Sequence, residues 1–248
     1  MDTALDVVEF LKPKPCPVPL VRIGGNRDGA YLVPDDLAGV SACFSPGVSN
    51  RKGFEDDLQD RYGIGAHMCD FTSEEDKFAT PLRSGQSFRK LWLGTETEGD
   101  TITLQDWVSE QAPDDSDLLL QMDIEGAEYP TLNTAPDDVL RRFRAVLVEL
   151  HGLVRLNKPH RLELVLPFFE KLSRHFTCVH IHPNNVREQI RIGKTNYWVP
   201  RILEVTLLRK DRFDAAGELI PPQLPHPLDI PFNVRWKQPQ AMGKIWLS

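Results

Sequence analysis

The sequence predicts an α/β protein built on a mostly parallel sheet with helices on both faces. Short aliphatic runs, typical of buried strands, alternate along the chain with segments whose apolar residues recur at helical spacing. Strands that alternate with helices in this way usually pair in parallel, because each helix crosses a face of the sheet. The 248 residues, 41% of them hydrophobic, suffice for one large domain with a full core.

The expected elements follow from the hydrophobic spacing. Residues 3–12 predict a short helix before Pro13, and residues 21–33 predict two extended pieces around a glycine-containing turn. We expect the seven strands of the sheet at residues 41–45, 64–70, 87–94, 117–123, 144–151, 177–182 and 201–209. We expect its helices at residues 53–62, 103–111, 128–143 and 160–176.

Two further features of the sequence refine this outline, namely the positions of the prolines and the lack of an expected helix between the last two strands. Pro130 and Pro136 should break the third helix, and Pro167 should kink or interrupt the fourth, because proline lacks the N–H that a helix interior requires. No helix is expected between the strands at 177–182 and 201–209, so these two can pair as an antiparallel hairpin at the edge of the sheet.

Composition divides the chain into three parts. Residues 1–35 predict an N-terminal helix and hairpin-like extension, residues 36–211 the α/β domain, and residues 212–248 a Pro-rich tail without regular helix or strand. Apolar side chains in the tail suggest that it packs on the domain, namely Ile220, Leu224, Ile230, Phe232 and Trp236.

The composition also limits the partners. A formal net charge of -7 argues against a large surface for nucleic acid or anionic membranes. No apolar run approaches the ~18 residues of a membrane span, and the N-terminus lacks the basic region of a signal peptide. None of the four cysteines forms a CxxC pair, which is typical of reduced cysteines in a cytosolic protein. We therefore expect a cytoplasmic protein that acts on a small molecule, with homo-oligomer formation left open.

The first two strand ends resemble a nucleoside site. In an open α/β sheet, ligands bind beyond the carboxyl ends of the strands. Gly47 follows the first strand and allows a tight turn, while Ser49 and Asn50 can cap the next helix. Asp70 ends the second strand, about 20 residues further on, where an acidic residue can accept hydrogen bonds from both ribose hydroxyls. Together these residues predict bound adenosine.

Acidic and imidazole side chains gather at the ends of three later strands. Alternate residues of a strand share a face, and three such pairs occur: Asp123 with Glu125, Glu149 with His151, and His180 with His182. Carboxylates and imidazoles together can serve as general bases or hold a divalent metal.

These segments resemble the FkbM family of class I, S-adenosylmethionine-dependent methyltransferases, from about residue 20 to about residue 210. The most specific piece is QMDIEGAEYPTL, which is similar to the family's Asp-x-Glu-Gly-Ala-Glu segment before a helix. RAVLVELH resembles the strand that follows it, and FSPGVSNRKGFEDDLQDRYG with HMCDFT resembles the glycine motif, first helix and strand-end acid.

The resemblance implies a Rossmann-like class I methyltransferase fold, with seven strands and an antiparallel last strand. It implies S-adenosyl-L-methionine as the cofactor, with Asp70 on the ribose and Asp123 facing the sulfonium. The cofactor-binding residues that we expect are Ser45, Gly47, Asn50, Asp70, Phe71 and Asp123.

The resemblance further implies O-methylation of a small hydroxylated acceptor, such as a secondary metabolite or a sugar. His151 and His182 are the candidate general bases, because imidazole titrates near neutral pH. Asp123 and Glu125 could orient that base. Alternatively, Asp123 with Glu149 or His182 could hold Mg²⁺ against the acceptor.

Two other functions remain open from the sequence. The cluster of Asp123, Glu125, His151 and His182 would also suit a metal-dependent hydrolase with a metal-activated water. The glycine motif reads SPGVSN, with Pro46 and Ser49 where glycines are frequent in class I enzymes. This departure would suit a non-catalytic binding protein that keeps the fold.

Overall fold

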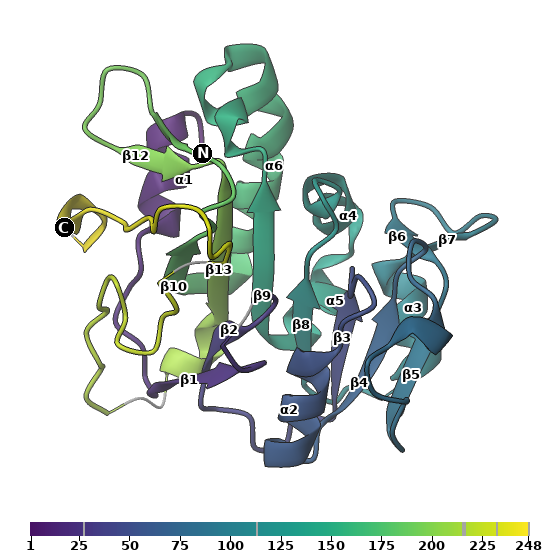
Figure 1. Ribbon diagram of the computed structural model, residues 1–248. Coiled ribbons are helices and arrows are strands. Elements are labelled where there is room, and N and C mark those ends of the chain that lie inside the picture. The colour runs from purple at the N-terminus through teal and green to yellow at the C-terminus, as the bar shows by residue number, and fades with distance from the viewer. Residues whose placement is uncertain (27, 113, 215–216, 232, 248) are drawn as a thin grey trace.

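A seven-stranded sheet forms the centre of the molecule (Figure 1). The computed structural model describes residues 1–26, 28–112, 114–214, 217–231 and 233–247. The strands lie in the order β10–β13–β9–β8–β3–β4–β5. Their bounds are β3 Ala42–Pro46, β4 Gly65–Cys69, β5 Gln86–Arg89, β8 Leu118–Met122, β9 Phe143–His151, β10 Phe176–Pro183 and β13 Ile202–Arg209.

The sheet is mostly parallel, as the sequence predicts. Strands β9, β8, β3, β4 and β5 pair in parallel. The last strand, β13, is antiparallel to both β9 and β10, which confirms its expected direction. The two last strands do pair with each other, but only β10 lies at the edge. β13 inserts between β10 and β9, with Leu203 opposite Leu150.

The expected single strand at 87–94 is wrong. The structure has β5 and then a separate strand, β6 (Trp92–Gly94), which pairs outside the main sheet with β7 (Thr101–Thr103). The chain turns between them, where the N–H of Leu91 donates to the carbonyl of Arg89 at 2.9 Å. A hydrogen bond between residues two apart closes a tight turn, which ends the extended backbone.

The helices follow the expected positions, with corrections at the prolines. The structure has α1 Ala4–Leu11, α2 Gly53–Tyr62, α3 Leu104–Gln111, α4 Glu128–Thr134, α5 Asp137–Arg142 and α6 Pro159–His175. A break occurs at Pro136, which precedes α5, but Pro130 lies in the first turn of α4, where its missing N–H costs nothing. Helix α6 is not interrupted at Pro167. Pro167 and Glu163, whose carbonyl loses a partner, lie on the exposed side of α6, where water can compensate.

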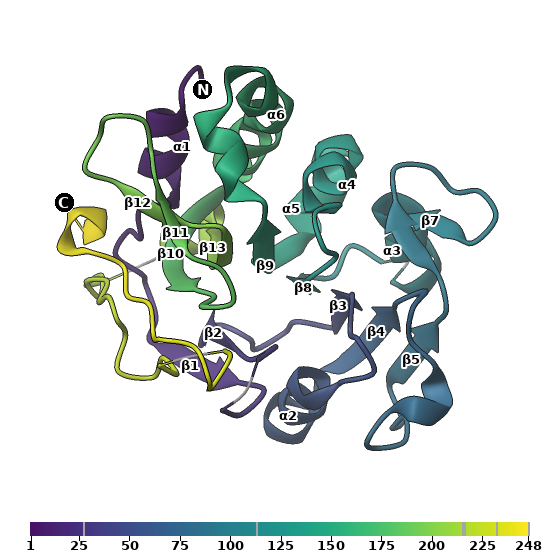
Figure 2. The same ribbon diagram turned by 45° about the horizontal axis from the view of Figure 1, so that its top comes forward.

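The two faces of the sheet are covered differently (Figure 2). Helices α1, α3, α4, α5 and α6 cover one face, against inward residues such as Leu118 and Leu120. The other face carries α2 beside the hairpin of β1 (Leu20–Ile23) and β2 (Tyr31–Pro34), against residues such as Leu119. The alternation of Leu118, Leu119 and Leu120 between the two cores is the period-two pattern of a strand buried on both faces.

The tail lies beside the same hairpin and the edge of the sheet, and its apolar residues are only partly used. Leu224 packs against the core, whereas Ile220 is 43% exposed and Trp236 is 87% exposed. Phe232 lies outside the described residues. The buried anchors of the tail are instead Met242 and Trp246.

The helices of the described residues include none with the length and apolar character needed to cross a bilayer.

Candidate active site

The ends of three neighbouring strands are joined by backbone hydrogen bonds. The N–H of Gly47, after β3, donates to the carbonyl of Cys69 at the end of β4, at 2.9 Å. The N–H of Asp123, after β8, donates to the carbonyl of Pro46 at 3.2 Å. These bonds place Gly47, Asp70 and Asp123 along one rim of the sheet, at the carboxyl ends of parallel strands.

Gly47 sits where only glycine fits. Its φ is +86°, and a Cβ atom built on it would lie 1.6 Å from the carbonyl oxygen of Asp123. A real Cβ cannot approach an oxygen so closely. The absence of a side chain therefore lets the backbones of the β3 and β8 loops come into contact at the rim.

Both carboxylate oxygens of Asp70 accept hydrogen bonds from neighbouring residues of the protein. Its Oδ1 accepts from the N–H and the hydroxyl of Thr72, at 2.8 and 2.7 Å. Its Oδ2 accepts from the N–H of Ser49 and the hydroxyl of Ser73, both at 2.8 Å. Burial raises the pKa of Asp70, but these donors outweigh it and hold the pKa below the usual value. Asp70 thus ties the β4 loop to the β3 loop.

Asn50 and Phe71 face the β4 loop rather than the centre of the rim. The Oδ1 of Asn50 accepts from the N–H of Glu74 at 2.8 Å. The ring of Phe71 stacks on Trp92 with centroids 5.2 Å apart, and the Nζ of Lys90 lies 5.8 Å from the centroid of the Phe71 ring. Trp92 is 48% exposed, so this pair offers an aromatic surface beside Asp70.

Ser45 belongs to a buried polar group under the rim. Its hydroxyl donates to Glu55 of α2 and to the Oε1 of Gln121 on β8, the latter at 2.7 Å. Burial raises the pKa of Glu55 to about 7, although the Ser45 hydrogen bond opposes the shift. Ser45 therefore links α2 to the sheet.

A cavity of about 410 Å³ lies between the β3 loop, the start of α2 and the β8 loop. Its walls include Gly47, Gln121, Asp123 and Glu125, with Asp28 from the β1–β2 hairpin. The volume falls within the roughly 300–1,000 Å³ of small-molecule pockets. Other expected residues lie outside this lining: Ser45, Asn50, Asp70, Phe71, His151 and His182.

His151, at the end of β9, is held by a buried carboxylate. Its Nδ1 lies 3.0 Å from the Oε1 of Glu128, a residue of α4 that is fully buried. The same oxygen accepts from the N–H groups of Ile124 and Gly126, at 3.2 and 3.1 Å. Burial lowers the pKa of His151, but the hydrogen bond and charge of Glu128 outweigh it, so the pKa is raised.

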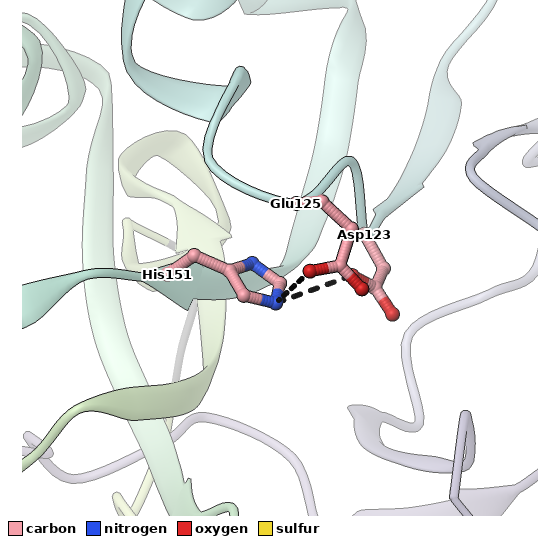
Figure 3. Close-up of side chains that lie close together, drawn as sticks. All are labelled: Asp123, Glu125 and His151. Carbon is pink, nitrogen blue, oxygen red and sulfur yellow. Dashed lines mark ion pairs between the residues drawn. The ribbon is translucent and has the colours of Figure 1, made fainter. Parts of the chain in front are cut away.

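The other nitrogen of His151 faces two carboxylates (Figure 3). Its Nε2 lies 3.3 Å from the Oε2 of Glu125 and 3.8 Å from the Oδ1 of Asp123. One ligand atom from each of these three residues lies within 4.8 Å of the others, so the group could hold a divalent cation. The side chain of Glu125 is 85% exposed, whereas that of His151 is 12% exposed.

Asp123 has the most perturbed environment of the three. Burial raises its pKa to about 6, against the opposing charge of His151 and a hydrogen bond from Glu149. Burial and the charge of Asp123 raise the pKa of Glu149 well above its usual value, so Glu149 is the protonated donor of this pair. Glu149 also accepts from the Nδ2 of Asn184 at 2.7 Å.

His182 points to a different partner. Its Nδ1 lies 3.6 Å from the Oδ1 of Asp229 in the tail, and His180 lies 2.9 Å from the same oxygen. Burial lowers the pKa of His182, but Asp229 and Glu204 outweigh it and raise the pKa. Among the described residues, the cluster with metal-ligand spacing contains Glu125 and His151 beside Asp123, not Glu149 and His182.

Sequence reasoning missed two residues that organise this region. Glu128 was visible as an acid in the DIEGAE segment, but only the start of α4 against β9 shows that it is buried on His151. Asp229 lies 49 residues after His180 in a Pro-rich stretch, where no periodicity predicts a contact.

A comparison with protein families covers this part of the chain. The Methyltransferase FkbM domain matches residues 42–175, which is more than half of the chain. The match spans the strands and loops that carry Gly47, Asp70, Asp123 and His151. A search of curated proteins found no match to the chain. The chain therefore belongs to the FkbM methyltransferase family.

Proposed function

We propose that this methyltransferase uses S-adenosyl-L-methionine to methylate a hydroxyl group of a small acceptor. The observation that carries the proposal is the cavity of about 410 Å³ where Gly47 and Asp123 meet, at the carboxyl ends of two adjacent parallel strands. Ligands of open α/β sheets bind at this position. The cofactor, when bound, supplies a methyl group that its sulfonium makes electrophilic.

The residues of the rim fit such a cofactor. Gly47 lines the cavity without a side chain, and Asp123 offers a carboxylate to a positive sulfonium. Asp70 could hold the ribose if the ribose hydroxyls replaced two of its present hydrogen-bond donors. The hydroxyls of Thr72 and Ser73 can rotate away and be replaced by ribose hydroxyls, while the N–H of Ser49 keeps the carboxylate in place. Phe71 and Trp92 would then lie on the adenine side.

Of the two candidate histidines, His151 is the better placed to take the acceptor proton, because its ring lies beside Asp123 and Glu125, which line the smaller cavity. With Nδ1 against Glu128, the proton of the neutral ring resides on Nδ1 and the Nε2 lone pair faces Asp123 and Glu125. Glu128 stabilises the imidazolium that forms when Nε2 accepts a proton. This is the base–orienter arrangement of general-base catalysis. His182 is the weaker candidate, because its ring is directed to Asp229.

Calorimetric titration tests the cofactor. S-adenosylmethionine and S-adenosylhomocysteine should both bind the wild-type chain. Asp123→Asn should bind S-adenosylmethionine less tightly while retaining S-adenosylhomocysteine, since only the former carries the sulfonium charge. Asp115→Asn, a change on an exposed loop, is the matched control. Absence of binding of either compound to the wild-type chain would refute the cofactor assignment.

Release of S-adenosylhomocysteine tests the base. In a panel of sugars and hydroxylated acids, any substrate found for the wild-type protein should be turned over about 10²-fold or more slowly by His151→Ala. His182→Ala should retain turnover, and equal losses in both variants would remove His151 from the role. A chain that binds the cofactor but turns over no acceptor would instead fit a non-catalytic binding protein.

A metal-dependent hydrolase is the rival function, and the spacing of Asp123, Glu125 and His151 is the observation that favours it. Thermal shift separates the two, because a ligand that binds the folded state raises its melting temperature. A rise with Mn²⁺ or Zn²⁺ that His151→Ala abolishes, without any rise with S-adenosylhomocysteine, would favour the hydrolase.

A further inference from the structure

A second, larger cavity adjoins the proposed cofactor cavity. It has a volume of about 1,100 Å³ and lies between the turn of the β1–β2 hairpin, the β3 loop and the tail. Both Figure 1 and Figure 2 show the C-terminal segment running beside this hairpin. Asp28 and Arg51 line both cavities, so the two adjoin at these residues. A molecule in the larger cavity would therefore lie next to one in the smaller.

Three guanidinium groups line the larger cavity, those of Arg22, Arg51 and Arg235. Within the described residues, none of them has a carboxylate oxygen within ion-pair distance, and Arg51 and Arg235 make no side-chain hydrogen bond. Arg209, by contrast, is paired with Asp117 at 2.7 Å. The three groups are thus positive charges with donors left for a ligand.

Two side chains of the same cavity also leave polar atoms without a partner. Arg22 donates from Nε to the carbonyl of Gly25 at 2.6 Å, but its Nη2 is buried and has no acceptor among the described residues. Asn233 donates from Nδ2 to Asp28 and Glu204, at 3.1 and 2.5 Å, while its Oδ1 is buried without a donor. A buried polar atom without a partner destabilises the fold until something supplies one.

The acidic residues of the cavity are already engaged. Asp229 accepts from His180 and lies near His182, and hydrogen bonds to these rings hold the pKa of Asp229 well below its usual range. Asp28 accepts from Asn233. The three arginines that line the cavity outnumber its two acidic residues, Asp28 and Asp229.

We propose that this cavity binds the methyl acceptor and that the acceptor carries an anionic oxygen group together with its hydroxyls. Arg22, Arg51 and Arg235 would hold the anion, whether a carboxylate or a phosphate, because guanidinium groups match both in geometry. This inference rests on the proposed function, since it takes the adjoining cavity as the cofactor site.

Binding of matched sugars tests the proposal. Glucuronate and glucose 6-phosphate share a hexose frame with glucose but carry the two kinds of anion. In calorimetric titrations of the protein saturated with S-adenosylhomocysteine, both anionic sugars should bind at least tenfold more tightly than glucose. Equal binding of all three, or binding of none, would overturn the proposal.

Two arginine variants locate the binding. Arg22→Gln and Arg235→Gln change only the larger cavity, and each should weaken the anionic sugars tenfold or more while leaving the affinity for S-adenosylhomocysteine within about twofold. Arg161→Gln, on the exposed side of α6, is the control and should change neither. Unchanged anion affinity in both cavity variants would refute the site. A wild-type chain that does not bind S-adenosylhomocysteine would refute the proposed function separately.

Discussion

At the scale of single residues, Gly47 is the position where one methyl group should do the most damage. Its Cβ would lie 1.6 Å from the Asp123 oxygen, so the β3 and β8 loops would have to separate in Gly47→Ala. We expect a loss of stability of about 3 kcal/mol or more, beyond the 1–2 kcal/mol of a left-handed non-glycine residue. Urea unfolding measures this loss, and calorimetry should show weaker binding of S-adenosylhomocysteine.

Gly63 provides the control for this substitution. It follows α2 with a φ of +70°, and no atom lies within 4 Å of a Cβ placed there. Gly63→Ala should therefore show only the backbone cost of about 1 kcal/mol and should leave cofactor binding unchanged. Similar losses in the two variants would mean that the close approach to Asp123 is unimportant.

Asp70 should make the stability of the protein depend on pH in the acid range. Its pKa is lowered in the folded state, so its contribution is present above the unfolded value near 3.9 and is lost as the pH falls through the folded pKa. Asp70→Asn should be about 2 kcal/mol less stable at pH 7, because donors to a charged group are weakened. Urea unfolding of both proteins should converge toward pH 2, and a constant difference would argue against the charge.

At the scale of elements, the contact between α4 and β9 should control the titration of His151. Glu128→Gln keeps an oxygen for the backbone donors but removes the charge, so the pKa of His151 should fall. The raised pKa contributes stability below about pH 6.5, which is lost as the pH rises through the folded value. The difference in stability between the wild type and Glu128→Gln should therefore shrink above neutral pH.

Nuclear magnetic resonance titration of the His151 ring measures this change in pKa directly. If an acceptor is found, methyl transfer by Glu128→Gln should begin to rise at a lower pH than methyl transfer by the wild type. Glu125→Gln is the matched control, because Glu125 lies 3.3 Å from the other ring nitrogen but its side chain is mostly exposed. Water screens an exposed charge, so its removal should shift the pKa less. A larger shift in the pKa of His151 for Glu125→Gln than for Glu128→Gln would mean that Glu125, not Glu128, is the main cause of the raised pKa.

The sequence predicts the elements well where hydrophobic periodicity and a terminating glycine agree. Helix α2 has the expected bounds, since Gly63 ends it and its apolar residues face the sheet. The expectation that Ser49 and Asn50 cap this helix is wrong, because its N-cap is Lys52, which makes no side-chain capping hydrogen bond. The strand-end residues could be found because the parallel order brings the carboxyl ends of strands to one rim. The break between β5 and β6 could not be predicted, because the turn at residues 89–91 carries no glycine or proline.

Partners of the site residues were less predictable than their positions. Ser45 and Asp70 stand at strand ends as expected, yet their side chains are occupied by Glu55 and Gln121, and by Thr72 and Ser73. Such contacts depend on the tilt of α2 and the path of the β4 loop. Hydrophobic spacing specifies which face is buried, but not how polar groups within it pair.

At the scale of the whole molecule, the β1–β2 hairpin and part of the tail meet beside the sheet. The hairpin lies on the face where α2 is the helix, and residues of the hairpin and of the tail line the proposed acceptor cavity. Leu224, Met242 and Trp246 of the tail pack with the core of the opposite face. Asn185, after β10, fastens the tail by donating to the carbonyls of Val234, Lys237 and Gln238. Most residues that line the proposed cofactor cavity thus lie within the matched family domain, residues 42–175, while most residues that line the proposed acceptor cavity lie outside it.

This division predicts that loosening the tail removes acceptor binding but not cofactor binding. Trp246 is 1% exposed, and its Nε1 donates to the carbonyl of Trp198 at 3.3 Å. Trp246→Ala should lower the free energy of unfolding by up to about 3–5 kcal/mol. The loss cannot exceed the free energy with which the tail docks on the domain. Limited proteolysis should then cleave the tail rapidly, and glucuronate should no longer bind, while S-adenosylhomocysteine still does.

Trp236→Ala is the matched control for stability, because that side chain is 87% exposed and its removal leaves no buried cavity. Its unfolding midpoint and its rate of tail cleavage should equal those of the wild-type chain within error. If Trp246→Ala released the tail but glucuronate still bound as in the wild type, the tail would not form a wall of the acceptor site. If cofactor binding were lost together with the tail, the tail would instead support the β3 and β8 loops, and the separation of the two sides would fail.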